Sequence, residues 1–250
     1  MKRLVIVLCS MACAHALGTP PPIESIAPPP REDPAQLLKE ADEEWSRRFD
    51  AARAERLYLE AARANPRDPA AYAGAVRAKA FRIGRSKDGN ERGRLAGEAV
   101  GIGQLCEENA PRAPLCDYWL AAALGLQARE RAATGHDALP KMVELLRRAA
   151  ASDPSVDRGG PHRLLATLLL RAPGWPLGPG DEESALPQAQ AAVRIDPAYA
   201  PNQLALGEAL RKNGRAAEAR AAYAEALRLA TADGDPDASG WADEALAALH

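Results

Sequence analysis

The stretch DPAYAPNQLALGEALRKNGRAAEARAAYAEALRLA, residues 196–230, decides the fold. Its small and aromatic residues include Gly207, Gly214, Ala219, Tyr223 and Ala226, at successive intervals of seven, five, four and three residues. Small side chains let two antiparallel helices approach closely, and larger ones fill the gaps beside them. A glycine between the helices accepts the positive φ that a tight connection often needs. The stretch therefore predicts a helix, a turn at Gly214 and a second helix.

This pattern resembles the tetratricopeptide repeat (TPR), a helix–turn–helix unit of about 34 residues. The second-helix signature recurs upstream, and each copy ends at a proline: Pro66, Pro111, Pro154 and Pro197. Proline ends one helix and starts a new turn. The prolines are 45, 43 and 43 residues apart, so each unit holds extra residues. We expect these in long turns within three units, at FRIGRSKDGN (81–90), ARERAATGHDALP (128–140) and RAPGWPLGPGD (171–181).

We therefore expect an all-α, TPR-like solenoid with long turns inside its repeats. Composition agrees, since 47% of the 250 residues are hydrophobic but only 4% are aromatic. Such a core is built from Ala and Leu, which suits packed helices better than sheets. About five helix pairs fill 35–250, and a C-terminal helix caps them. The pairs are expected over 35–66, 69–111, 114–154, 161–197 and 200–231, with the cap over 236–250.

The N-terminus has the pattern of an export signal. Two basic residues precede an apolar run over 4–16, which is typical of a secretory signal peptide and too short to span a bilayer. Two processing routes stay open. Cleavage after Ala16 makes 1–16 the signal peptide, whereas a lipoprotein signal ends before Cys13 and lipidates it. The Pro-rich residues 17–34 then predict an extended tether, with a membrane reached only through the lipid.

The charge balance and the histidines argue against several classes of function. Lys and Arg number 32 against 34 Asp and Glu, a net charge of −2, so nothing indicates a nucleic-acid partner. None of His136, His162 and His250 pairs with another His or Cys at metal-ligand spacing. No G-x-S-x-G nucleophile pattern is present. We expect no catalytic residues, no metal and no cofactor, and a protein that is not an enzyme.

Cys106 and Cys116 form an even pair in a domain expected to be exported. They flank EENAPRAPL, a helix end followed by a Pro-containing connection. A disulfide between them closes a short loop and stabilises the fold by about 2–3 kcal/mol. The alternative is a pair of small buried thiols.

The glycines of GWPLGPGD, residues 174–181, do not form a phosphate-binding loop. No Lys-Ser/Thr follows them and no strand precedes them. They predict a long turn between two helices. Asp181 then acts as the N-cap of the second helix, where Glu182 and Glu183 suit the first turn.

The run GGPHRLLATLLLRAPGWPLGPGD (159–181) also supports a narrower resemblance. With CDYWLAAALGLQARERAATGHDALPKMVELLRRAAASDPS before it and DPAYAPNQLALGEAL after it, it resembles the T component (TatT) of TPR-protein-associated TRAP transporters. The match covers about 110–245. Members of that family are exported bacterial TPR-like proteins, often lipoproteins, understood to work with a periplasmic substrate-binding protein and a membrane permease. Ser10, where lipoproteins favour Leu, departs from their pattern.

The resemblance implies a periplasmic accessory of TRAP-type solute uptake, which docks a solute-binding protein, a permease or a ligand. Trp175 is held between Gly174 and Pro176, and it either packs back onto the solenoid or faces a partner. His162 and Arg163 either tie the long turn down or join Arg171 and Trp175 in a contact patch. Asn202 is either a helix N-cap or an amide facing the concave surface.

Two other functions fit the same fold. A general scaffold in cell-envelope assembly needs only the TPR-like solenoid. A direct carrier of small apolar solutes would use grooves lined by Leu and Ala. Ala-rich faces of the solenoid also allow self-association into an oligomer.

Overall fold

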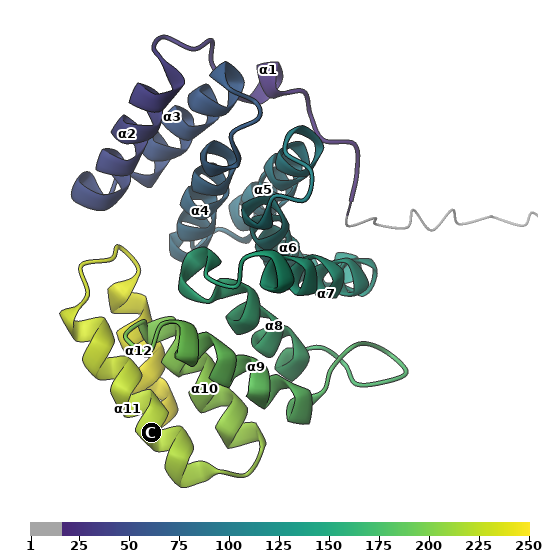
Figure 1. Cartoon of the computed structure of the whole chain (residues 1–250), viewed down its shortest axis with the longest axis vertical. Coiled ribbons are helices and arrows are strands. Elements are labelled where there is room, and N and C mark those ends of the chain that lie inside the picture. The colour runs from purple at the N-terminus through teal and green to yellow at the C-terminus, as the bar shows by residue number, and fades with distance from the viewer. Residues whose placement is uncertain (1–16) are drawn as a thin grey trace, which may run out of the picture.

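The computed structural model describes residues 17–250, which fold into successive antiparallel helix pairs (Figure 1). No strand forms among these residues, and their one isolated bridge joins Gly174 to Gly180. The predicted export signal and Cys13 lie outside the described residues. The helices are α1 Ile23–Ile26, α2 Pro34–Glu43, α3 Ala51–Ala64, α4 Pro69–Arg85, α5 Gly89–Asn109, α6 Pro114–Glu130, α7 Gly135–Ser152, α8 Gly160–Arg171, α9 Glu182–Ile195, α10 Ala200–Lys212, α11 Ala216–Ala232 and α12 Ala238–Leu249.

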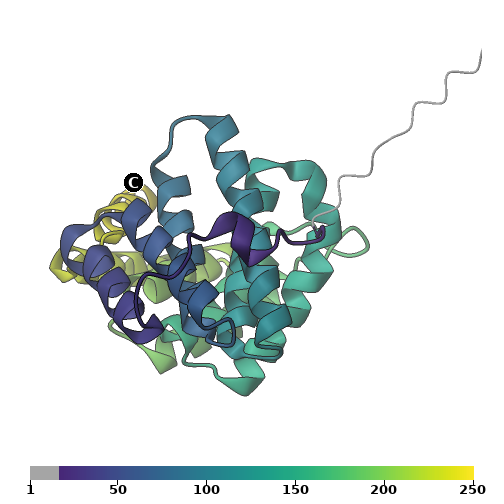
Figure 2. The same cartoon turned by 90° about the horizontal axis from the view of Figure 1, so that it is seen from above.

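The all-α solenoid predicted from the sequence is confirmed. Helices pair in chain order as α2/α3, α4/α5, α6/α7, α8/α9 and α10/α11, and α12 packs on the last pair. A π turn, η1 Glu44–Arg48, extends α2, and 3-10 turns η2 Ala132–Thr134 and η3 Val156–Arg158 precede α7 and α8. The stack curves, so the α11–α12 end lies beside α2–α4 in both views (Figures 1 and 2). Between them Arg85 Nη2 donates a hydrogen bond to the Pro236 carbonyl at 2.7 Å.

The helix boundaries follow local sequence signals. Aspartate side chains accept a backbone N–H at the starts of five helices, namely Asp33, Asp50, Asp68, Asp88 and Asp181. The N-cap role predicted for Asp181 is therefore confirmed, and its hydrogen bonds from Ser184 lower the pKa of its carboxyl. The helices α3, α5, α7 and α9 each end two residues before one of the four predicted prolines. Gly214 has the predicted positive φ, 75°.

The extra residues of the repeats are placed differently from the expectation. In the second and third pairs they mostly lengthen helices, because α4 runs to Arg85 before α5 begins at Gly89, and α6 runs to Glu130 before α7 begins at Gly135. The last turn of α4 is held by apolar burial: Ile83 is fully buried and packs against Leu95 of α5. Only the 172–181 segment is a long turn.

Ala and Leu build the core, as the composition predicts. One cluster of buried side chains runs through the first four pairs and a second joins α10, α11 and α12. The closest helix approaches pair a glycine with a tyrosine ring. A Cβ on Gly207 of α10 would lie 2.6 Å from the ring of Tyr223 in α11, and one on Gly74 of α4 would lie 2.5 Å from the ring of Tyr58 in α3.

Residues 17–33 do not form the free, extended tether that their prolines predict. Gln104 Nε2 donates to the Gly18 carbonyl at 2.6 Å, and Arg63 Nη1 donates to the Ala27 carbonyl at 2.9 Å. The Arg31 guanidinium bonds the buried Glu60 carboxylate at 3.0 Å. The segment packs because Ala27 and its isoleucine neighbours give it apolar side chains to bury against the core.

Cys106 at the end of α5 and Cys116 at the start of α6 form a disulfide, with Cα atoms 5.3 Å apart. The bond ties the second helix pair to the third. No helix in the described part of the chain is both long and apolar enough to cross a membrane.

Candidate functional site

A groove of about 910 Å³ opens among the inner helices of the solenoid. Side chains of α6, α7, α8, α10 and α12 line it, with a contribution from α4, and the 172–181 turn forms part of its rim. The groove thus draws on four helix pairs and the cap. Its apolar lining side chains include Leu126, Leu139, Met142, Leu164, Leu168, Leu204 and Trp241.

The charged side chains at the groove are mostly paired with one another. Arg171 Nη2 lies 2.9 Å from Glu208 Oε2, and Arg129 Nε lies 2.9 Å from Glu130 Oε1. Glu244 on α12 stands beside the Arg171–Glu208 pair, and partial burial raises the pKa of its carboxyl, with the Glu208 charge adding to the rise. The groove therefore offers an apolar floor edged by ion pairs, which suits an apolar ligand or segment better than a highly charged one.

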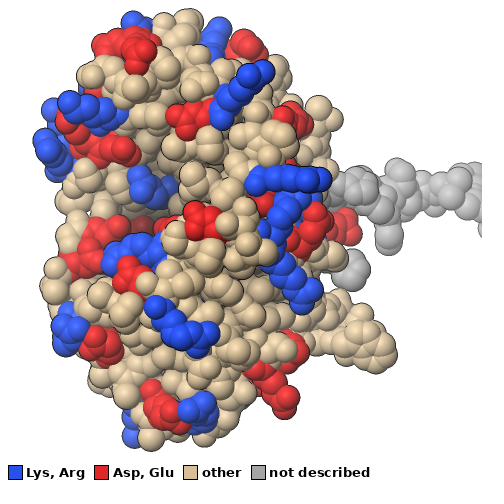
Figure 3. Space-filling model, viewed as in Figure 1, with Lys and Arg blue, Asp and Glu red and all other residues tan. Residues whose placement is uncertain are grey.

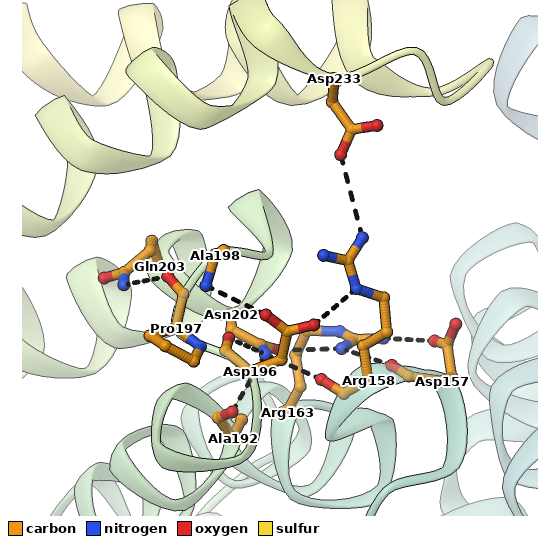
Figure 4. Close-up of polar contacts among 10 residues, drawn as sticks. All are labelled: Asp157, Arg158, Arg163, Ala192, Asp196, Pro197, Ala198, Asn202, Gln203 and Asp233. Atoms are coloured by element: carbon orange, nitrogen blue, oxygen red, sulfur yellow. Dashed lines mark hydrogen bonds and ion pairs between the residues drawn. The ribbon is translucent and has the colours of Figure 1, made fainter.

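Arg163 lies at the centre of a buried polar cluster behind the groove (Figure 4). Its Nη1 donates to Asn202 Oδ1 at 2.8 Å, and its Nη2 bonds Asp157 Oδ2. Asn202 Nδ2 in turn donates to the carbonyls of Arg158, Ala192 and Asp196 at 2.8–3.0 Å. Through these bonds Arg163 and Asn202 fasten η3, α8, α9 and α10 together.

Both expectations for Asn202 are wrong. The side chain is fully buried, with 0% exposure, so it does not face the concave surface. It is also not an N-cap, because α10 begins two residues earlier at Ala200. In sequence, Asn202 has the pattern of an N-cap, because it is an Asn next to a Pro near the start of a helix. The difference arises because η3, α9 and the α9–α10 turn enclose the amide, and each supplies one of its three carbonyl acceptors, Arg158, Ala192 and Asp196.

Aromatic rings connect this cluster to the groove wall. The Tyr118 hydroxyl bonds Asp157 and receives a hydrogen bond from Arg163 at 3.1 Å, and burial raises its pKa well above the usual value. Tyr199 stacks edge-on against Trp241 at 5.3 Å, and the Arg158 guanidinium covers its ring at 4.0 Å. The α12 wall of the groove therefore rests on the same cluster that holds α8 and α10.

The structure does not bring the predicted contact patch together. His162 Nδ1 bonds Gln188 Oε1 at 2.7 Å and lines a separate hollow of about 490 Å³ between α7, α8 and α9. Arg163 and Arg171 line the groove instead. Trp175 is 90% exposed at the tip of the long turn and lines neither space. The expectation that it packs onto the solenoid is wrong, because the proline and glycine backbone of the turn holds it outward.

Apart from Arg163 and Arg171, the residues that line the groove are absent from the sequence prediction. Leu139, Leu164 and Leu204 have the spacing of any buried helical leucine, and the curvature of the stack decides which of them face the groove. Among the apolar groove residues, Trp241 is the one that the sequence could have indicated, because it is a large aromatic residue in the capping helix. Over the face shown in Figure 3, basic and acidic side chains are interspersed and neither sign forms a continuous patch.

Comparison with known proteins supports the architecture. No protein-family model matches this chain, and no curated protein matches it in sequence. Among solved structures, the thermophilic TPR protein TTC0263 of Thermus thermophilus superposes with a TM-score of 0.63 at 22% identity, over 86% of this chain and 99% of that one. The chain has a TPR-type fold. MamA of Desulfovibrio magneticus RS-1 is more distant, with a TM-score of 0.48 at 19% identity, over 81% of this chain and 98% of that one.

Proposed function

We propose that this TPR-type solenoid is a non-enzymatic interaction module whose groove receives an apolar segment of a protein partner. The observation that carries the proposal is the groove of about 910 Å³, with its leucine-rich floor and its paired rim charges. Such a surface gives binding energy through apolar burial, while the ion pairs at the rim exclude a highly charged occupant.

We further propose that the protein is exported and serves a TRAP-type solute uptake system in the periplasm. The partner is then the solute-binding protein or the permease of that system. The support is the N-terminal signal pattern over 1–16 and the resemblance of the 110–245 region to the TatT family. A general role in envelope assembly would use the same groove with a different partner.

Two half-buried leucines in the groove allow a direct test. Leu139→Glu and Leu164→Glu each place a carboxylate on the apolar floor without removing a fully buried side chain. Isothermal titration calorimetry with a purified TRAP solute-binding protein from the same organism measures the effect. We expect each variant to weaken binding at least tenfold, because a carboxylate facing an apolar segment is desolvated without a partner.

Leu246→Glu is the matched control. Leu246 is an exposed leucine of α12 that does not line the groove, so this variant is expected to bind like the wild type. Equal binding by all the variants would place the interface elsewhere. No binding by the wild-type chain to the solute-binding protein or the permease would refute the TRAP proposal and leave the envelope-scaffold role.

The apolar lining also supports a second candidate, direct carriage of a small apolar solute. Native mass spectrometry of gently purified protein distinguishes the two. A bound small molecule that is lost in Leu164→Glu supports the carrier role. A chain whose mass is that of the polypeptide alone, together with groove-dependent protein binding, supports the interaction module.

A further inference from the structure

The turn between α8 and α9 protrudes from the solenoid and has an uncharged tip. Residues 172–180 read APGWPLGPG and contain no ionisable side chain. Trp175 is 90% exposed and Leu177 69%, the highest values among the exposed large hydrophobic side chains of the described residues. The turn stands out on the right in Figure 1, and the matching projection in Figure 3 carries neither blue nor red. An apolar tip of this kind marks a contact surface.

The tip is held on a stiff base. Gly180 N donates to the Pro173 carbonyl at 2.8 Å, and Asp181 N donates to the Leu169 carbonyl in α8 at 2.9 Å. A Cβ on Gly180 would lie 2.2 Å from the Ala172 carbonyl oxygen, so the two arms of the turn touch through their backbones. Trp175 is therefore presented outward by the fold and is not the end of a loosely attached loop.

The backbone of the turn has few free donors, since only the N–H groups of Gly174 and Trp175 lack a backbone acceptor. Three of its nine residues, Pro173, Pro176 and Pro179, have no N–H group. The N–H groups of Ala172, Leu177, Gly178 and Gly180 donate within the turn or to α8. A segment that enters a lipid phase needs its backbone donors satisfied internally, since hydrocarbon offers no acceptor. A protein partner would impose no such requirement.

The position of the turn agrees with a membrane. The N-terminal segment of the described chain, drawn in purple, begins on the same side of the molecule as the turn in both views (Figures 1 and 2). The sixteen residues before it contain the apolar run 4–16. We propose that Trp175 and Leu177 insert into the interfacial region of a phospholipid bilayer. Tryptophan favours that region because its ring is apolar and its indole N–H can still reach water and headgroups.

The charges beside the tip indicate the kind of lipid. Asp181, Glu182 and Glu183 follow directly and are exposed, whereas Arg171 on the other side is paired with Glu208. One further cation, the exposed Arg147 of α7, lines the same hollow as Pro179 and Asp181, so a single positive charge stands against three carboxylates beside the tip. Insertion therefore depends on apolar burial, and we expect zwitterionic phosphatidylcholine to bind better than a mixture that contains an anionic lipid.

Fluorescence quenching tests the insertion directly. The full chain is mixed with phosphatidylcholine vesicles whose acyl chains carry bromine, which quenches a tryptophan that reaches them. We expect quenching in the wild type. We expect it to disappear in Trp175→Phe, which keeps an apolar ring at the tip and leaves Trp45, Trp119 and Trp241 as internal controls. Because the difference in quenching between the wild type and Trp175→Phe reports Trp175 alone, a contact that residues 1–16 make equally in both proteins cancels from the comparison.

Vesicle co-sedimentation supplies the second measurement. Trp175→Ser with Leu177→Ser should lower the partition coefficient on the order of tenfold, because two large apolar side chains no longer enter the lipid. Leu246→Ser, at an exposed leucine of α12, is the control and should change it little. All variants alter exposed side chains, and circular dichroism verifies that they fold.

Three results would overturn the proposal. These are unquenched wild-type protein, quenching that persists in Trp175→Phe, and a double variant that partitions like Leu246→Ser. If the wild type is unquenched and the double variant instead loses binding to the solute-binding protein, the tip is a protein-docking surface. Leu177 also lines the rim of the groove, whereas Trp175 does not, so loss of protein binding in Trp175→Ser alone assigns the docking surface to the tip and not to the groove.

Discussion

Arg85 and Pro236 join the two ends of the solenoid, although 151 residues separate them in the chain. The Arg85 side chain leaves the last turn of α4, donates to the Pro236 carbonyl at 2.7 Å and also covers the Phe81 ring at 4.0 Å. The segment it holds, residues 233–237, leads into α12, which forms one wall of the groove. Because the contact holds the segment that leads into α12, it helps to fix the position of the groove wall relative to α4.

Removal of this contact should loosen the approach to α12. Arg85→Ala is expected to speed amide hydrogen exchange in the 233–241 peptide by about fivefold, since an exposed hydrogen bond contributes about 1 kcal/mol. Hydrogen-exchange mass spectrometry measures the change. Arg94→Ala is the control, because Arg94 pairs with Glu98 on α5. Equal protection of the peptide in both variants would show that α12 holds its place without Arg85.

Asp237 at the start of α12 should make stability depend on pH. Burial raises the pKa of its carboxyl to about 6, with help from the charge of Asp235 and against the opposing effect of Arg85 and Arg77. The unfolded value is near 3.9. Between about pH 4 and pH 6 the Asp237 carboxyl keeps its proton in the folded state and loses it in the unfolded state. Its contribution to the free energy of unfolding is therefore full below about pH 4 and is lost as the pH rises through about 6.

Asp237→Asn should therefore stabilise the protein at pH 7.5 by about 2 kcal/mol and have little effect at pH 4. Urea denaturation at both pH values gives the difference. Asp243→Asn removes the same charge from an exposed position of α12 and serves as the control. A stabilisation by Asp237→Asn that is equal at both pH values would mean that the Asp237 carboxyl titrates normally in the folded protein.

Gly207 and Gly97 make a matched pair of helical glycines. A Cβ on Gly207 would lie 2.6 Å from the Tyr223 ring, whereas a Cβ on Gly97 meets nothing within 4 Å. Gly207→Ala should destabilise the fold by about 1–3 kcal/mol through overpacking. Gly97→Ala should stabilise it by about 0.5–1 kcal/mol through helix propensity. Thermal unfolding of both variants decides, and a change of the same sign in both would contradict the packing argument.

The glycine–tyrosine contact also shows what the sequence could predict. Gly207, Gly214 and Tyr223 fall at fixed spacing within one hairpin, so their packing is local and the pattern reveals it. Proline and aspartate positions likewise mark helix ends and starts, because capping is decided by the nearest few residues. The fold class and the helix pairs follow from such signals.

The site depends on contacts between residues far apart in the chain. Leu139, Leu164 and Leu204 share a groove only because the stack curves, and each has the spacing of an ordinary core leucine. Arg163 looks like a surface residue at a helix start, yet Asp157 and Asn202 surround it in the fold. Trp175 differs from these residues because it lies in a local feature, the proline and glycine turn. The sequence predicts that turn, but it does not predict the direction in which the turn points.

Asn202 gives the sharpest test of the buried cluster. Asn202→Ala leaves Arg163 without one acceptor and leaves three carbonyls without their donor, so the free energy of unfolding should fall by about 3 kcal/mol. Asn202→Asp keeps the shape and the bond from Arg163, but it turns an oxygen toward those carbonyls and should cost at least about 2 kcal/mol at pH 7.

Asn213→Ala is the control, because Asn213 is partly exposed and also donates to two carbonyls. Its cost should stay near 1 kcal/mol or below. Chemical denaturation measures all three. If Asn202→Asp were as stable as the wild type, the three donated bonds would not hold α9 and α10 together, and the shape of the amide alone would explain its burial.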